Sequence, residues 1–328
     1  LRAPTVIAVF KGALVFGAAI GMTVVALTSL GGPETIFNRA IFGTGSALAA
    51  RTGAGLLLDP SLYGAFASLA VGSALALPMY PHVLTATFAA SGKDTLRRAA
   101  IGLPAWTGML GLFGFLGIAA LAAGIHTPPG AAETAVPLLV ARLLPGALAG
   151  AVFGALAVGA LVPAAVMSVA VATLFVRNIY VEFFFPTATP KHELRIARVV
   201  SLITKVGALA FVFGLRDQDA INLQLLGGVW ILQTFPAVAL GAFVRWFHRA
   251  GLVAGWAIGM ITGTVFVVSG GFSSVIDIGA GSWSVRLYAA LVALVLNLAV
   301  AAVVTLVCRR RGTTTGFGEL PRPSASLA

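Results

Sequence analysis

The sequence predicts an all-α integral membrane protein with about eight transmembrane helices. Of the 328 residues, 59% are hydrophobic and only 9% are charged, whereas soluble domains carry about 25% charged residues. Apolar stretches long enough to cross a bilayer core of about 30 Å alternate with short polar connections. So few charges cannot cover the surface of a water-soluble fold, so lipid is the expected solvent for most of the chain.

Eight spans are predicted from this pattern, each helical because lipid satisfies no backbone polar group. They lie at about residues 4–29, 64–90, 100–124, 146–177, 195–215, 220–244, 250–271 and 284–308. The longer connections, about 30–63 and 125–145, contain Gly and Pro, and residues 137–144 are expected to form a short helix. The transmembrane domain is predicted to cover residues 1–311, followed by a disordered tail at 312–328 that is rich in Gly, Ser, Thr and Pro.

Basic residues are concentrated in alternate connections, which predicts an orientation. The richer set comprises Lys93, Arg97, Arg98, Arg177, Lys191, Arg195, Arg198, Arg245, Arg249, Arg309, Arg310 and Arg311. By the positive-inside rule, this set and the C-terminal tail are predicted to be cytoplasmic, in the inner (cytoplasmic) membrane of the cell. The net charge of +11 comes largely from short basic runs between apolar spans, and these runs do not form a basic patch on a soluble surface. Nucleic-acid binding is therefore not expected.

The acidic residues and the cysteine content argue against enzyme chemistry. All ten carboxylates lie in connections or at span ends, so no span offers a buried carboxylate for a proton relay or acid–base work. The sequence has neither a His-Glu-x-x-His nor a Gly-x-Ser-x-Gly motif. Cys308 is the single cysteine, which excludes an internal disulfide and a Cys-rich metal site. The chain is therefore not expected to be an enzyme or to hold a resident cofactor.

Two ionisable residues lie deep within predicted spans. His82 belongs to the run Pro78-Met79-Tyr80-Pro81-His82, in which two prolines three residues apart remove two backbone donors. Helices broken within the membrane often form the substrate sites of transporters, although a kinked packing helix with a satisfied histidine explains the run equally well. Lys205 lies about 15 Å along its helix from Arg195. There it pairs with a substrate anion, pairs with a group on an expected missing part of the protein, or extends its side chain to the interface.

The fourth span contains a set of oxygen donors. Pro163 frees the carbonyl of Gly159, one turn earlier, and Ser168 adds a hydroxyl on the same face as Ala164 and Ala165. Such hard oxygen ligands suit an ion such as Na⁺. The alternative is that Ser168 bonds only its own helix backbone.

At these residues the sequence resembles the sodium/solute symporter family, in particular its branch of monocarboxylate uptake permeases. The resemblance rests on residues 73–77, 80–82, 93–98, 159–168, 175–180 and 223–233. It extends over nearly the whole chain, to about residue 308. It implies a core of ten helices in two inverted repeats of five. The first span would match the last helix of repeat one, the next five would match all of repeat two, and the last two would be trailing helices. Because the chain begins at Leu1 rather than Met, the first four core helices are expected to be missing, and these residues alone are not expected to transport.

The resemblance also implies a set of site residues. The family holds sodium between its first and eighth core helices, where the Ala165 carbonyl and the Ser168 hydroxyl would be ligands. Val169 stands where many members have a second hydroxyl, so protons are an alternative coupling ion. The family's broken sixth helix matches the second span, which makes Tyr80 and His82 substrate-side candidates, and Gln233 is a candidate on the matched tenth helix.

The function expected from this resemblance is symport of small monocarboxylates, driven by Na⁺ or H⁺ and working by alternating access. The expected partners are the carboxylate substrate, a monovalent cation, the lipid bilayer and the missing N-terminal helices. Symport of another small solute, such as an amino acid, vitamin or sugar, is the main alternative. A channel or a membrane receptor is a further one, although a channel usually requires a symmetric pore with a ring of charges or carbonyls.

Overall fold

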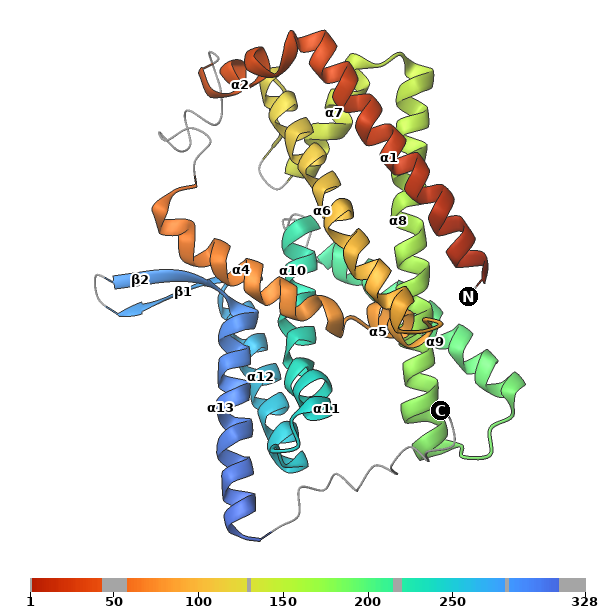
Figure 1. The fold of residues 1–328 in the computed structure, drawn as a ribbon, viewed down its shortest axis with the longest axis vertical. Coiled ribbons are helices and arrows are strands. Elements are labelled where there is room, and N and C mark those ends of the chain that lie inside the picture. Colours follow the sequence, from red (N-terminus) through yellow and green to blue (C-terminus); the bar gives the residue numbers. More distant parts are fainter. Residues whose placement is uncertain (1, 43–57, 129–130, 215–219, 281–282, 313–328) are drawn as a thin grey trace. The chain divides into compact units, whose positions relative to one another are not determined.

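The computed structural model describes residues 2–42, 58–128, 131–214, 220–280 and 283–312. Within these ranges it is mainly helical, and eight helices are long and apolar enough to cross a membrane (Figure 1). These are Ile7–Leu30, Pro60–Met79, Lys93–Ala122, Gly146–Phe184, Pro190–Gly214, Ala220–Leu240, Arg249–Ser269 and Ala289–Arg310. The predicted helical membrane fold is confirmed. The tail predicted to be disordered lies outside the described residues, apart from Gly312.

The chain divides into two compact units, which are described separately. The first comprises Leu1–Leu57 and Leu84–Asp219, and the second comprises Leu58–Val83 and Ala220–Ala328. The break in the second predicted span therefore lies at the edge of the second unit, whereas the fourth span belongs to the first.

In its described residues the first unit contains helices and connections but no strand. In chain order it contains α1 (Arg2–Leu30), α2 (Gly32–Phe42), most of α5 (Pro81–Phe88), α6 (Lys93–Ala122), η3 (Ala132–Thr134), α7 (Ala135–Leu143), α8 (Gly146–Phe175), the π-helix η4 (Val176–Phe184) and α9 (Pro190–Gly214). Its hydrophobic core joins α1, α2, α6 and α7 through buried Met22, Ile36, Leu116 and Leu139. The predicted short helix at 137–144 is present as α7.

Helix α2 was not expected within the connection at 30–63. The chain enters it through Gly31 and Gly32, whose φ angles of +91° and +87° are readily adopted only by glycine. Ile36 and Ala40, four residues apart and therefore on one face, are fully buried. This apolar stripe holds α2 against the core, although its composition is too polar to mark a span.

The second unit combines helices with one β-hairpin. It contains η1 (Pro60–Leu62), α4 (Tyr63–Ala76), η2 (Leu77–Met79), α10 (Ala220–Ile231), η5 (Leu232–Thr234), the π-helix η6 (Pro236–Leu240), α11 (Gly241–Phe243), α12 (Arg249–Ser269), β1 (Val275–Ala280), β2 (Trp283–Tyr288) and α13 (Ala289–Arg310). The strands are antiparallel, with Val275 opposite Tyr288 and Asp277 opposite Arg286. The hairpin is a local addition to the predicted all-α fold, and β2 occupies the residues that were assigned to the start of the last span.

Helices α12 and α13 are in close contact along their lengths. Gly251, Gly255, Gly259 and Gly263 recur every four residues on α12 and are buried. A Cβ atom at Gly255 would lie 2.5 Å from the backbone oxygen of Asn297 and 2.8 Å from the Cβ of Ala301. Small residues at this spacing let two helix backbones approach, so this pair has no room for a larger side chain at its centre.

Candidate substrate and ion sites

The helix that begins at α4 is broken at Tyr80. Helix α4 ends at Ala76, a 3₁₀ turn follows over Leu77–Met79, and Tyr80 is extended, with φ −63° and ψ 133°. Pro78 and Pro81 explain the break, because neither offers an amide donor and each clashes with the preceding turn. A single proline does not interrupt two other long helices, since α6 continues through Pro104 and α8 through Pro163.

The break brings together the two substrate-side candidates, Tyr80 and His82. Their ring centroids lie 5.6 Å apart, at an interplanar angle of 49°. The Nδ1 atom of His82 is buried and has no hydrogen-bond partner among the described residues. Buried polar atoms are nearly always paired, so an unpaired imidazole nitrogen beside a helix break suits a polar ligand.

Gln233, the third substrate candidate, is fully buried in a polar network between helices. Its amide nitrogen donates to the carbonyl of Val229 at 3.0 Å and to that of Ala290 at 3.2 Å. Asn297 on α13 donates in turn to the backbone oxygen of Gln233 at 2.9 Å and to its side-chain oxygen at 3.2 Å. The network ties η5 to α13, and a contact of Gln233 with substrate stays a prediction.

Tyr288 is a second buried residue that links helices of this unit by hydrogen bonds, and the sequence analysis did not identify it. Its hydroxyl donates to the carbonyl of Leu225 at 2.8 Å, and its amide donates to the Ser68 hydroxyl at 2.8 Å. A Cβ atom at Gly72 would lie 2.5 Å from the Tyr288 ring. Tyr288 therefore joins α4, α10 and the start of α13, the elements around the helix break.

The predicted ion ligands lie on α8 in the first unit. Ser168 is buried, and its hydroxyl donates to the carbonyl of Ala165 at 2.9 Å. The carbonyl of Gly159 lacks its usual donor because Pro163 stands four residues later. A Cβ atom at Gly159 would lie 3.1 Å from the Val15 side chain of α1. The two predicted ligand oxygens are therefore adjacent on one side of the helix, and their role in binding an ion stays a prediction.

Hard oxygens dominate the donors available for a cation. Among the described residues, no group of three or more His, Cys, Asp or Glu side chains could hold a metal ion. A carbonyl and a hydroxyl suit a monovalent ion that exchanges during transport better than a tightly held transition metal.

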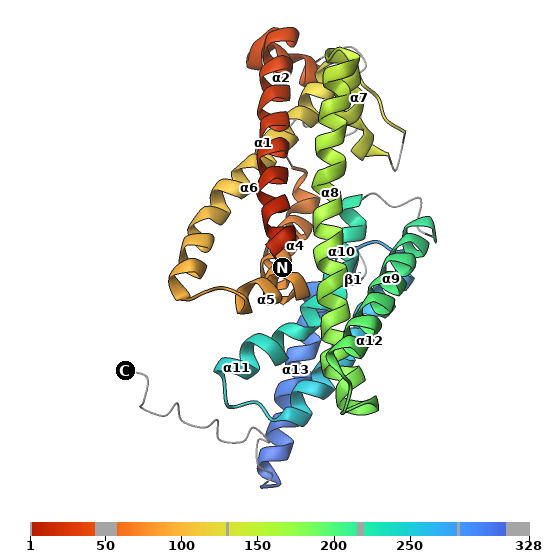
Figure 2. The same ribbon diagram turned by 90° about the vertical axis from the view of Figure 1, so that its right-hand side faces the viewer.

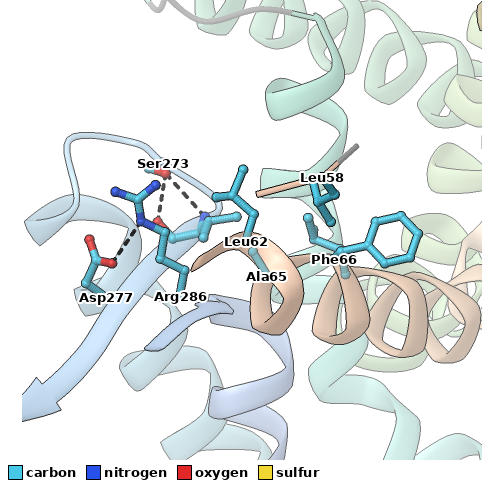
Figure 3. Close-up of a pocket in the computed structure, with 9 residues that line it drawn as sticks. Leu58, Leu62, Ala65, Phe66, Ser273, Asp277 and Arg286 are labelled. Carbon is cyan, nitrogen blue, oxygen red and sulfur yellow. Dashed lines mark hydrogen bonds and ion pairs between the residues drawn. The ribbon is translucent and has the colours of Figure 1, made fainter. Parts of the chain in front are cut away.

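A separate hollow of about 510 Å³ lies between the hairpin and the start of α4 (Figure 3). Leu62 and Phe66 line one side, and Arg286 donates to Asp277 at 3.1 Å on the other. Nearby, hydrogen bonds from Ser61 lower the pKa of Asp59, and the charge of Arg286 acts in the same direction. Because Arg286 already pairs with Asp277, this hollow offers no unpaired charge to bind a carboxylate.

Asn297 and Tyr288 could be recognised from the sequence only weakly. Asn297 is a polar residue in the middle of the last span, four residues before Ala301 and eight before Thr305, opposite the glycines of α12. Its amide carries no charge, so a search for ionisable residues within spans passes over it. Tyr288 stands at a span end, where aromatic residues are common in membrane proteins for other reasons.

Comparison with known proteins provides independent evidence. Residues 1–263 match the model of the sodium:solute symporter family. A monocarboxylate transport permease protein of Rhizobium johnstonii is 42% identical over 304 residues, which cover 93% of this chain and 61% of that protein. An uncharacterized symporter of Bacillus subtilis, YodF, is 30% identical over 204 residues, or 60% of this chain and 40% of that protein. The chain thus spans less than two thirds of the length of either relative.

Proposed function

Because this chain belongs to the sodium:solute symporter family, we propose that it serves in cation-coupled symport of small monocarboxylates. The observation that carries the proposal is the buried, unpaired Nδ1 atom of His82 beside the break at Tyr80. The name of the Rhizobium johnstonii relative supports the substrate class.

A neutral imidazole suits this role better than a fixed cation. A permanent charge within the membrane is costly, whereas a neutral histidine donates one hydrogen bond without that cost. The Tyr80 hydroxyl, in the same break, is a second donor for the other carboxylate oxygen. Transport requires no covalent step, which agrees with a site that contains donors but no nucleophile.

The coupling ion is proposed to bind at Ala165 and Ser168, with Na⁺ or H⁺ as the driving cation. Ala165 contributes a carbonyl and Ser168 a hydroxyl, 2.9 Å apart. Val169, 50% exposed, contributes no oxygen. With one hydroxyl fewer, the site should hold Na⁺ weakly, since ion affinity depends on the number of ligands.

Uptake by proteoliposomes tests the proposal. The protein is expressed from its complete coding sequence and reconstituted, with the Rhizobium johnstonii permease in parallel as a positive control. Labelled pyruvate, lactate and acetate are supplied under imposed Na⁺ or proton gradients, with choline replacing Na⁺. Saturable, gradient-driven uptake above empty liposomes is expected, and its absence for all three substrates under both gradients would refute the proposed function.

His82→Ala tests the site itself. Losing one hydrogen bond to a charged group costs about 1.5 to 3 kcal/mol, so the KM for pyruvate should rise at least about ten-fold while the amount of folded protein is unchanged. His126→Ala is the matched control, because His126 is exposed and lies in a connection. Identical kinetics for the two variants would remove His82 from the substrate site.

A further inference from the structure

A groove runs along the first unit between α8 and α9, which pack side by side (Figure 2). Its larger part has a volume of about 450 Å³ and includes Val169, Arg198, Leu202 and Lys205 in its lining. A smaller hollow of about 260 Å³ adjoins it, because the two share Thr173, Leu194 and Ala197 in their linings.

The larger part of the groove carries two cations and no acidic side chain in its lining. Arg198 and Lys205 are seven residues apart on α9, and so lie on one face about 10 Å apart along the axis. Helical side chains lean toward the N-terminus of their helix, so both cations are directed toward the same end of α9 and stay about two turns apart. In the adjoining hollow, Arg177 already pairs with Glu193 at 3.6 Å, which leaves that carboxylate engaged.

These cations lie on an exposed helix that is mostly apolar after Arg195. Helix α9 contains no buried residue, and Leu202, Ile203 and Val206 are each about 60% exposed. A cation within a membrane span is costly unless it is paired. The groove therefore suits a ligand that is anionic at one point and apolar beside it.

We propose that this groove binds an anionic phospholipid. Its phosphate would lie between the Arg198 guanidinium and the Lys205 ammonium, and an acyl chain would follow the apolar wall formed by Val169 and Leu202. Basic pockets between transmembrane helices are suited to anionic lipid headgroups, and an Arg fork matches phosphate geometry. The site makes use of Lys205, for which the proposed transport function has no role.

Lipid retention by the purified protein tests the proposal. The full chain, purified in detergent, is mixed with equal amounts of phosphatidylglycerol and phosphatidylcholine, and the bound lipid is measured by native mass spectrometry. Wild type should retain phosphatidylglycerol preferentially. Each cation removed should lower the preference roughly five-fold, so Arg198→Gln/Lys205→Gln should lose most of it.

Arg97→Gln/Arg98→Gln is the matched control, because it removes two cations from the start of α6, outside the groove. It should retain the wild-type preference, and equal losses in both double variants would show that only net charge matters and overturn the site. Arg198→Lys/Lys205→Arg keeps both charges and should also retain the preference, which separates loss of binding from misfolding.

Leu202→Trp fills the groove without changing its charge, and it should displace phosphatidylglycerol. Unchanged retention in this variant would place the lipid elsewhere and refute the proposal. Millimolar phosphate or acetate should not compete with the lipid. Displacement by either would show that the groove takes soluble anions, which would overturn the assignment to phospholipid without touching the proposed substrate site at His82.

Discussion

The helix pairs α12–α13 and α8–α9 differ in how closely their two helices pack. In the first pair, a glycine every four residues brings two backbones together around buried Asn297. In the second pair, α9 contains no buried residue and leaves a groove lined by Arg198 and Lys205. The comparison indicates that small residues at helical spacing mark a pair whose contact is complete. Cations inside a span mark a pair that, by our proposal, is completed by a further ligand.

The largest expected effect comes from adding one methyl group to the close-packed pair. In Gly255→Ala the new Cβ would meet the backbone of Asn297 at 2.5 Å, and backbone cannot move aside cheaply. Overpacking of this kind costs about 1 to 3 kcal/mol. The midpoint of unfolding in detergent, followed by circular dichroism, should fall clearly.

Gly207→Ala on α9 is the matched control for that change. No atom lies within 4 Å of a Cβ at Gly207, and alanine favours the helix over glycine by roughly 0.5 to 1 kcal/mol. This variant should be as stable as wild type or slightly more so. If both alanines destabilise equally, the contrast between the two pairs is wrong.

A smaller loss of stability is expected from removing the hydrogen bonds between Asn297 of α13 and Gln233. Asn297→Leu deletes the two hydrogen bonds that the amide donates to Gln233, and interhelical hydrogen bonds in membranes are worth about 0.6 to 2 kcal/mol. The Asn297 Oδ1 atom has no partner among the described residues, so its loss should cost nothing. A double-mutant cycle tests this, with unfolding midpoints measured for Asn297→Leu, Gln233→Leu and the double variant. If the two single losses of stability simply add in the double variant, the two side chains do not interact.

Tyr288→Phe should cost about 1 kcal/mol, the usual net worth of one buried hydrogen bond. The ring would still pack against Gly72, and only the bond from the hydroxyl to the Leu225 carbonyl would be lost. Tyr63→Phe is the control, because Tyr63 is 58% exposed. Equal unfolding midpoints for the two variants would show that the Tyr288 hydroxyl contributes nothing to stability.

The spans and the helix break were predictable because both depend on local rules. Apolar runs of about 20 residues mark a span whatever surrounds them, and Pro78 with Pro81 breaks a helix whatever it packs against. The hairpin was not predictable in this way. Its second strand, Trp283–Tyr288, continues directly into the apolar run of α13, so hydropathy assigned most of it to the span.

The site was less predictable than the fold because its contacts are long-range. The family resemblance indicates Gln233 as a site residue, yet its partners Ala290 and Asn297 lie 57 and 64 residues later in the chain. The bond from Ser168 to Ala165 was local, and the alternative that Ser168 bonds its own backbone had anticipated it. The inverted repeat and the cytoplasmic orientation stay predictions, since each concerns an arrangement beyond a single helix.

The smallest effect on stability, but an informative one, is expected from Val169→Ser in the open pair. Val169 is 50% exposed on α8 and next to the buried Ser168 hydroxyl, so a serine there should change the free energy of unfolding by less than about 0.5 kcal/mol. It would, however, restore a second hydroxyl beside the proposed ion ligands. We therefore expect weak Na⁺ dependence of uptake in wild type and a stronger dependence in Val169→Ser. The Na⁺ concentration for half-maximal uptake should fall about ten-fold, since one added ligand to a charged group is worth roughly 1.5 kcal/mol or more.

Val171→Ser adds a hydroxyl two residues further along the same helix and should leave Na⁺ dependence unchanged. Uptake is measured with Na⁺ and with choline. A steep Na⁺ requirement in wild type, or the same response in both serine variants, would show that Val169 does not set the choice of coupling ion.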